Sequence, residues 1–305
     1  MTTRGSLRTK ILTLALLPAV AMYLLVAVLS YFAAQAVAED LVIDRDRELA
    51  RLSAAELSAS LQEYPELLSG VARDLAAAGD SEEALGSNLS GMANRLTYFD
   101  GGVALLDNLG RVVATYPAAG TAGDDWSAQP IFRQIIQNPN RPSFSNLISN
   151  SLSGGEPALA LAVPVRTARN ELRGVLVGQF RVGLDVLNAF YGTLLRLRLD
   201  SKGQAYVIDA AGRLIFATPE DNAAAGRSLD DHPVVGPALS GGAGALRTTS
   251  AGKEALASYG PIPGTGWSLV IEEDWGTLMS PLRRYAAGLS LLLLLGIIVP
   301  ALVVA

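Results

Sequence analysis

The chain has 305 residues, half of them hydrophobic, a net charge of −5 and a mean hydropathy of +0.31. Such an apolar composition is typical of proteins with membrane segments rather than of ordinary soluble globules. The absence of cysteine excludes disulfides, thiolate metal sites and cysteine nucleophiles. A single histidine, His232, argues against a histidine metal site or a catalytic triad. No basic cluster follows the N-terminus, so nucleic acid is not an expected partner.

The first uncharged run covers residues 11–38 and exceeds the roughly 20 apolar residues that cross a bilayer. Basic residues precede it and acidic residues follow it, so the positive-inside rule places residues 1–10 in the cytoplasm. Ala36-Val37-Ala38 resembles a signal-peptide cleavage site, but the run is about twice as long as a signal peptide's apolar segment. We therefore favour an uncleaved first membrane helix over residues 11–38.

A second uncharged run, residues 285–305, is again long enough to span a membrane. The sequence stops at Ala305 with no basic residues after this run. We therefore expect a fragment of a longer protein whose cytoplasmic output domain lies beyond Ala305. The two runs together predict a multi-pass protein of the cytoplasmic (inner) membrane, in contact with the lipid bilayer and with residues 39–284 on the extracytoplasmic side.

The segment after the first apolar run, residues 39–79, predicts a long helix that Pro65 should kink. Its apolar residues recur at alternating spacings of four and three, which places them on one helical face. That face either packs on the structure that follows, which we favour, or forms a dimer seam. For the whole protein we expect a homodimer. The residues of the face are Leu57, Leu61, Tyr64, Leu68, Val71 and Leu75.

An internal repeat follows. Gly102–Pro117 and Gln204–Pro219 each contain a β-rich run, an Asp-x-x-Gly turn beginning at Asp107 or Asp209, and a second β-rich run. This pattern predicts a hairpin in each copy, because glycine supplies positive φ and aspartate bonds the turn backbone.

A second matched pair, Gly155–Pro164 and Gly252–Pro261, extends the repeat to two α+β units. Each unit is expected to be an antiparallel sheet with helices on one face. The predicted modules cover residues 80–199, distal to the membrane, and 200–284, proximal to it. Helices are predicted over residues 131–137, 184–197 and 233–239.

Four strings carry a resemblance to the double Cache sensing domains of bacterial chemoreceptors, sensor histidine kinases and diguanylate cyclases. They are Asp125–Phe132, Gly155–Pro164, Gly203–Asp209 and Gly264–Val270. The resemblance covers nearly the whole chain, from the first apolar run to the second. It implies two PAS-like modules on a long helix and small-molecule binding, most often in the distal module. No cofactor is expected.

The same resemblance implies that the segment containing Trp126, Gln129, Phe132 and Arg133 lines the distal pocket. Trp126 and Phe132 would supply apolar walls, although aromatic residues there could equally be ordinary core. Gln129 stands where an arginine is common in the family. A glutamine lacks the charge that would hold a carboxylate bidentately, so carboxylate binding by this segment is not expected.

Arg181 is the fifth candidate ligand contact. It occupies the position at which amino-acid-binding members carry an aspartate that meets the ammonium group, so an amino-acid ligand would face a like charge there. The site should favour an anion or a neutral polar solute. In the alternative interpretation, Arg181 pairs with Glu156 or Asp185 on the surface.

Other polar residues have structural explanations. Asp107 and Asp209 share one offset from a turn glycine, which favours turn chemistry over ligand contact. Asp125 is expected to cap the turn after it. His232 is expected to be a solvated loop residue.

The sequence therefore predicts the extracytoplasmic small-molecule sensing region of a bacterial transmembrane receptor. The alternative is a membrane-anchored solute-binding protein with no output domain of its own. No catalytic or metal-binding residues are assigned, and an enzyme is not expected.

Overall fold

The computed structural model describes residues 7–77, 82–149, 152, 155–182, 203–218, 225–250 and 252–281, with Tyr285, Gly288 and Ile298. The chain divides into two compact units, Asp46–Glu273 and a unit that combines Met1–Arg45 with Asp274–Ala305.

The N-terminal helix α1 covers Leu7–Leu61. Within the described residues, one helix near the N-terminus is long and apolar enough to cross a membrane. Large apolar side chains between Met22 and Val37 are exposed, as expected for a surface that faces lipid. Most of the second predicted span, residues 285–305, lies outside the described residues, so a second membrane crossing stays a prediction.

The predicted helix over residues 39–79 is two helices. Helix α1 ends at Leu61, and α2 (Glu63–Ala77) begins after the turn at Gln62. Pro65 lies in the first turn of α2 and has no N–H to donate to the carbonyl of Leu61, which replaces the expected kink with a break. The apolar face that spans the break is 0–4 % exposed and belongs to the core of Asp46–Glu273, which confirms the packing interpretation.

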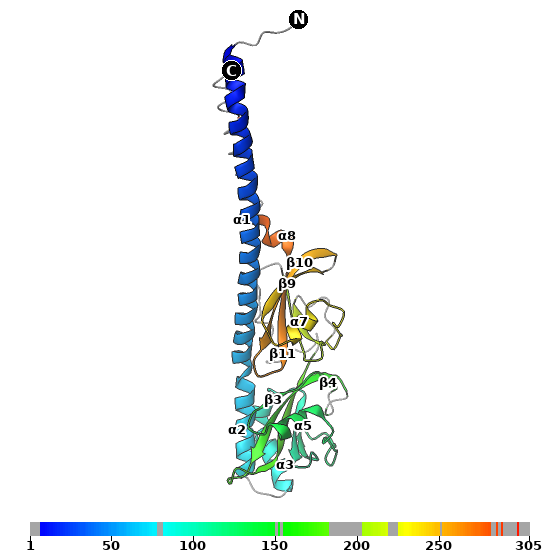
Figure 1. The fold of residues 1–305 in the computed structure, drawn as a ribbon. Coiled ribbons are helices and arrows are strands. Elements are labelled where there is room, and N and C mark those ends of the chain that lie inside the picture. The colour runs from blue at the N-terminus through cyan, green and yellow to red at the C-terminus, as the bar shows by residue number, and fades with distance from the viewer. Residues whose placement is uncertain are drawn as a thin grey trace. The chain divides into compact units, whose positions relative to one another are not determined.

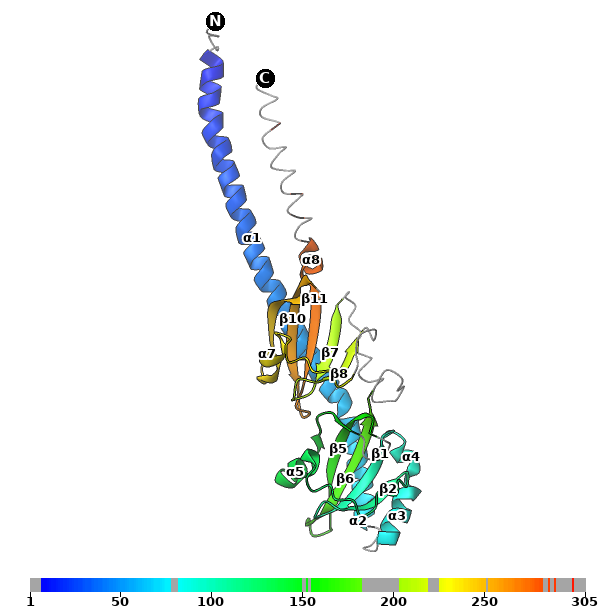
Figure 2. The same cartoon turned by 90° about the vertical axis from the view of Figure 1, so that its right-hand side faces the viewer.

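The distal sheet is entirely antiparallel, with strand order β2-β1-β6-β5-β3 and β4 also paired with β5. Figure 1 labels β3 and β4, and Figure 2 labels the other four strands. Its outer hairpin is the one predicted from the Asp-x-x-Gly turn. The strands are β1 (Gly102–Asp107), β2 (Val112–Tyr116), β3 (Ser143–Phe144), β4 (Ile148–Ser149), β5 (Pro157–Arg166) and β6 (Leu172–Arg181).

Helices cover both faces of this sheet, which corrects the expectation of helices on one face. Phe180 and its neighbours on one face pack with α2 and with α3 (Glu82–Gly91), near the short α4 (Ala93–Leu96). Val177 and its neighbours on the other face pack with α5 (Pro130–Gln137). Figure 2 shows α3 and α5 on opposite sides of the strands.

The proximal sheet has the order β8-β7-β11-β10-β9 and begins with the second predicted hairpin. The order β2-β1-β6-β5 of the distal sheet thus recurs as β8-β7-β11-β10, which confirms the internal repeat. Helix α7 starts two residues later than predicted, and the predicted helix over 184–197 lies outside the described residues. The elements are β7 (Gln204–Ile208), β8 (Leu214–Thr218), α7 (Val235–Leu239), β9 (Gly244–Ser250), β10 (Lys253–Ile262), β11 (Trp267–Asp274) and α8 (Trp275–Leu278).

Candidate functional site

Trp126 and Phe132 lie together on the α5 side of the distal sheet. They are 5 % and 6 % exposed and pack with Ile131, Ile135 and small sheet residues such as Ala160. The structure therefore brings the two predicted aromatic residues to one face, where they form part of a closed apolar core.

The other two candidates of this segment lie farther from that core. Arg133 is exposed on α5. Gln129 is half-buried at the N-cap of α5, where its side chain makes no capping hydrogen bond. Asp125, just before this segment, accepts a hydrogen bond from the backbone N–H of Ser127 at 2.8 Å, which confirms the predicted turn cap. Hydrogen bonding to Ser127 also lowers the pKa of Asp125.

Arg181 ends β6 and is paired with Glu156. The guanidinium contacts Glu156 Oε2 through Nη2 at 2.6 Å and through Nε at 2.8 Å. This is the surface pair foreseen as the alternative to ligand contact. Both side chains are substantially exposed, and such pairs contribute about 0–1 kcal/mol to stability. An anionic ligand would therefore compete with Glu156 at a small energetic cost.

Gln179 is a polar residue of the same face that was not among the predicted site residues. It lies two residues before Arg181 on β6, and its cross-strand partners are the small residues Gly102 and Ala160. The residue is 0 % exposed, and among the described residues neither its amide oxygen nor its amide nitrogen has a hydrogen-bond partner. An unpaired buried polar group costs about 1–3 kcal/mol. The sequence signal that could have indicated this residue is its polar amide side chain within the apolar run that forms β6.

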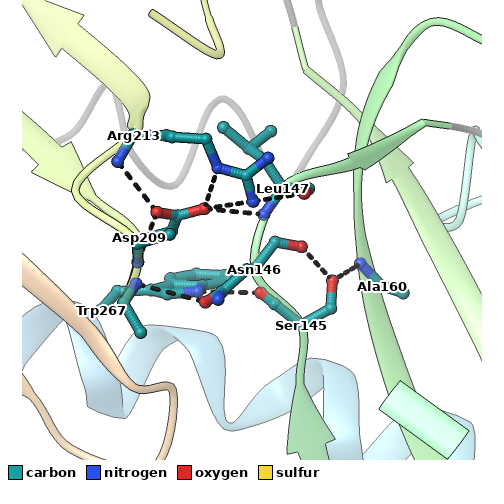
Figure 3. Close-up of polar contacts among 9 residues, drawn as sticks. Ser145, Asn146, Leu147, Ala160, Asp209, Arg213 and Trp267 are labelled. Atoms are coloured by element: carbon teal, nitrogen blue, oxygen red, sulfur yellow. Dashed lines mark hydrogen bonds and ion pairs between the residues drawn. The ribbon is translucent and has the colours of Figure 1, made fainter. Parts of the chain in front are cut away.

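A cluster of polar contacts joins the loop after β3 to the proximal hairpin (Figure 3). Asp209 is fully buried, and its Oδ2 accepts a hydrogen bond from the backbone N–H of Leu147 at 3.0 Å. The same oxygen contacts the guanidinium of Arg213, which in turn donates to the carbonyl of Leu147. The loop and the hairpin thus share one ion pair, in which the carboxylate is buried and the guanidinium is partly exposed.

Trp267 makes a second contact to the same loop. Its indole N–H donates to the carbonyl of Ser145 at 3.0 Å, and its ring packs edge-on against Phe144. Ser145 also holds β5, because its Oγ accepts from the N–H of Ala160 and its own N–H donates to the carbonyl of Ala160. Since Ala160 is the register partner of Gln179, the structure links Gln179 to Trp267 through Ala160 and Ser145.

Asp209 differs from its counterpart in the distal repeat. Asp107 Oδ1 accepts from the N–H groups of Leu109 and Arg111, as expected for a turn residue. Asp209 Oδ1 makes the equivalent turn bonds, but its Oδ2 reaches the other module. The interpretation of Asp209 as a turn residue alone is therefore incomplete.

The expectation of a solvated His232 is wrong. Its side chain is 23 % exposed, and Nε2 lies 3.1 Å from Oε1 of the buried Glu272. The hydroxyl of Tyr206 donates to the same oxygen at 2.6 Å. Among the described residues, no cluster of three or more His, Asp or Glu side chains is arranged to hold a metal ion.

A family model described as the Cache domain, of the double-Cache type, matches residues 34–282. The chain belongs to this family. This Cache chain is also similar in fold to the ligand-binding domain of the Pseudomonas fluorescens chemoreceptor CtaA in complex with L-isoleucine, with 20 % identity and a TM-score of 0.61. That match covers 81 % of this chain and 97 % of the other.

Two further solved structures share the fold. The extracellular domain of the putative histidine kinase rpHK1S-Z16 is 17 % identical with a TM-score of 0.60, over 81 % of this chain and 98 % of that chain. The ligand-binding domain of the Pseudomonas aeruginosa amino acid chemoreceptor PctB, in complex with L-Arg, is 18 % identical with a TM-score of 0.56, over 78 % and 97 %. No curated protein matches the sequence.

Proposed function

We propose that this Cache chain is the extracytoplasmic input region of a bacterial transmembrane receptor and that it binds a small molecule on the α5 side of the distal sheet. Membership of the Cache family and the apolar helix α1 support a membrane-anchored sensor. The observation that carries the proposal is Gln179, a fully buried amide without a partner among the described residues. A ligand that hydrogen-bonds this amide would remove the cost of leaving it unpaired.

The ligand is a neutral polar molecule or an anion rather than a free amino acid, although CtaA and PctB were solved with amino acids. Gln179 offers one donor group and one acceptor, which suits a neutral amide, hydroxyl or carbonyl. Arg181 adds a cation at the end of the same face once Glu156 is displaced. Trp126 and Phe132 supply apolar surface, and Gln129 and Arg133 contact larger ligands at the edge of α5.

The signal leaves the distal module through the link from Gln179 to Trp267. A ligand changes an output only if it binds two conformations with different affinity. Ser145 is placed to transmit such a difference, because it contacts both Ala160 beside the site and Trp267 of the proximal sheet. The ion pair of Asp209 and Arg213 holds the next residues of the same loop.

The test is a thermal-shift screen of the full chain in lipid nanodiscs with amino acids, carboxylates, sugars and amides, because a bound ligand raises the melting temperature. The best ligand is then titrated into Gln179→Met and Arg181→Ala. Arg247→Ala is the matched control, since Arg247 forms a similar exposed pair with Glu254 in the proximal sheet. We expect loss of affinity in the first two variants only.

Two results would count against the proposal. Unchanged affinity in Gln179→Met would show that the ligand does not bind beside Gln179. A free amino acid as the tightest ligand would overturn the charge argument at Arg181. The output role has a separate test: if binding leaves the loop around Ser145 unchanged, an anchored solute-binding protein is the better account.

A further inference from the structure

The proximal module has a cavity of its own, on the face of the sheet that α7 covers. Its volume is about 120 Å³. Tyr206 and Glu272 lie on adjacent strands β7 and β11, and His232 reaches them from the turn before α7. The lining residues are Gln204, Tyr206, Leu214, Ala217, Thr218, Arg227, Leu229, His232, Ser250 and Glu272.

Glu272 is a buried carboxylate, 5 % exposed, in the wall of this cavity. Both of its hydrogen-bonding neighbours, Tyr206 and His232, contact Oε1. Within the described part of the chain, Oε2 has no hydrogen-bond or ion-pair partner, and it is not one of the fully buried unpaired atoms, so it is accessible from the cavity. Burial removes part of the hydration of this carboxylate, and a cation that contacts the accessible oxygen compensates for that loss.

The neighbours of Glu272 donate hydrogen bonds to one of its oxygens and leave the other available to a cation. Burial and the Glu272 carboxylate raise the pKa of Tyr206, so its hydroxyl stays protonated and serves as a donor. The nitrogen of His232 that faces the carboxylate is also a donor, since a carboxylate only accepts. The other nitrogen, Nδ1, is buried and has no partner among the described residues. Arg227 is exposed at the cavity, and the structure gives it no ion pair with Glu272 within the described residues.

We infer that this cavity is a second ligand site, which binds the ammonium group of a small organic amine against Glu272. An ammonium group has three donors and can satisfy Oε2 of Glu272 directly. It also places a positive charge opposite the carboxylate. The apolar wall of Leu214, Ala217 and Leu229 packs against the carbon atoms of the amine.

The volume limits the size of the ligand. At about 120 Å³ the cavity has room for a small ligand of a few non-hydrogen atoms. Pockets for drug-sized ligands are several times larger. The site therefore suits an amine of the size of ethanolamine. A larger amine would have to extend past Arg227 into solvent, where a carboxylate on the ligand would meet the guanidinium.

The test is calorimetric titration of the full chain in nanodiscs with ethanolamine, ethylene glycol and acetate. These three probes have the same number of non-hydrogen atoms and differ in charge. We expect ethanolamine to bind and the other two to bind at least about tenfold more weakly, because only the cationic probe can form a charge pair with the largely buried carboxylate of Glu272. Glu272→Gln should weaken ethanolamine binding at least about tenfold.

Two control variants make this test specific. Glu254→Gln removes an exposed carboxylate from β10 of the same sheet and should leave ethanolamine binding unchanged. Gln179→Met alters the distal face and should also leave it unchanged, which separates this site from the distal one. Glu272→Gln keeps an acceptor for Tyr206, so an unchanged melting temperature without probe shows that the variant is folded. Equal binding of acetate, no binding of ethanolamine, or full binding by folded Glu272→Gln would overturn the inference.

Discussion

Oδ2 of Asp209 accepts a hydrogen bond from the backbone N–H of Leu147, 62 residues earlier in the chain, at 3.0 Å. The carboxylate of Asp107, the matching residue of the distal repeat, accepts two hydrogen bonds, from the N–H groups of Leu109 and Arg111 in its own turn. The same turn motif thus has a second use in the proximal copy, where a buried carboxylate ties the two sheets of the sensor together (Figure 3).

The first prediction compares these two aspartates. Asp107→Ala loses two exposed turn bonds and should lower the free energy of unfolding by about 1 kcal/mol. Asp209→Ala also leaves the N–H of Leu147 and the guanidinium of Arg213 without their partner, and should lower it by about 2–4 kcal/mol, given that Arg213 is partly exposed. Chemical denaturation of both variants measures the difference. Equal losses would show that the contact between the sheets contributes nothing to stability.

A second prediction concerns Trp267. Trp267→Phe removes the donor to Ser145 and leaves a buried carbonyl unpaired, which should cost about 1–3 kcal/mol. Since Trp267 and Asp209 hold neighbouring residues of one loop, their effects should not add. A double-mutant cycle of Trp267→Phe with Asp209→Ala should give a coupling free energy of about 0.5–3 kcal/mol. Strict additivity would mean that the two contacts act separately.

The third prediction is that Gln179→Met stabilises the unliganded protein. Methionine fills a similar volume without a polar group, so the variant avoids the cost of an unpaired buried amide, about 1–3 kcal/mol. The measurement is the melting temperature without ligand, compared with Ser258→Ala, which removes a buried hydroxyl that does have a partner and should destabilise. A fall in the melting temperature of Gln179→Met would show that the amide has a structural partner.

The fourth prediction is the alkaline behaviour of Tyr206. Its pKa in the folded state is raised above the ordinary value of about 10 by burial and by Glu272. The folded state therefore keeps a proton that the unfolded state loses, and stability present below pH about 10 falls above it by about 1.4 kcal/mol per pH unit. Tyr206→Phe lacks this proton, so the stability advantage of the natural protein over the variant should shrink between pH about 9 and 11. A constant difference would contradict the raised pKa.

Local patterns in the sequence were sufficient to predict much of the fold. The apolar face from Leu57 to Leu75 and the two Asp-x-x-Gly hairpins predicted elements that the structure confirms. Asp107 and Asp209 looked equivalent because their turns are the same. The difference between them depends on Leu147, a residue distant in sequence, and no local pattern shows which turn will meet it.

The candidate site was harder to predict for the same reason. The sequence placed Trp126 and Phe132 on one segment, and the structure brings them to one face. The sequence did not reveal that Gln179 would be fully buried between small neighbours. Nor did it reveal that Arg181, two residues later, would pair with Glu156. His232 looked like a loop residue because Tyr206 and Glu272, which bury it, come from two separate strands.

The central claim is that ligand binding beside Gln179 is transmitted to the contacts between the two sheets. Hydrogen exchange of the full chain in nanodiscs, with and without the ligand found by screening, tests it most directly. Exchange reports local opening, and ligand binding lowers it where opening is suppressed. We expect slower exchange at Ala160 beside the site and also at Leu147 and Ala211, whose N–H groups donate to the carboxylate of Asp209. Slower exchange confined to the distal face, with Leu147 and Ala211 unchanged, would contradict it.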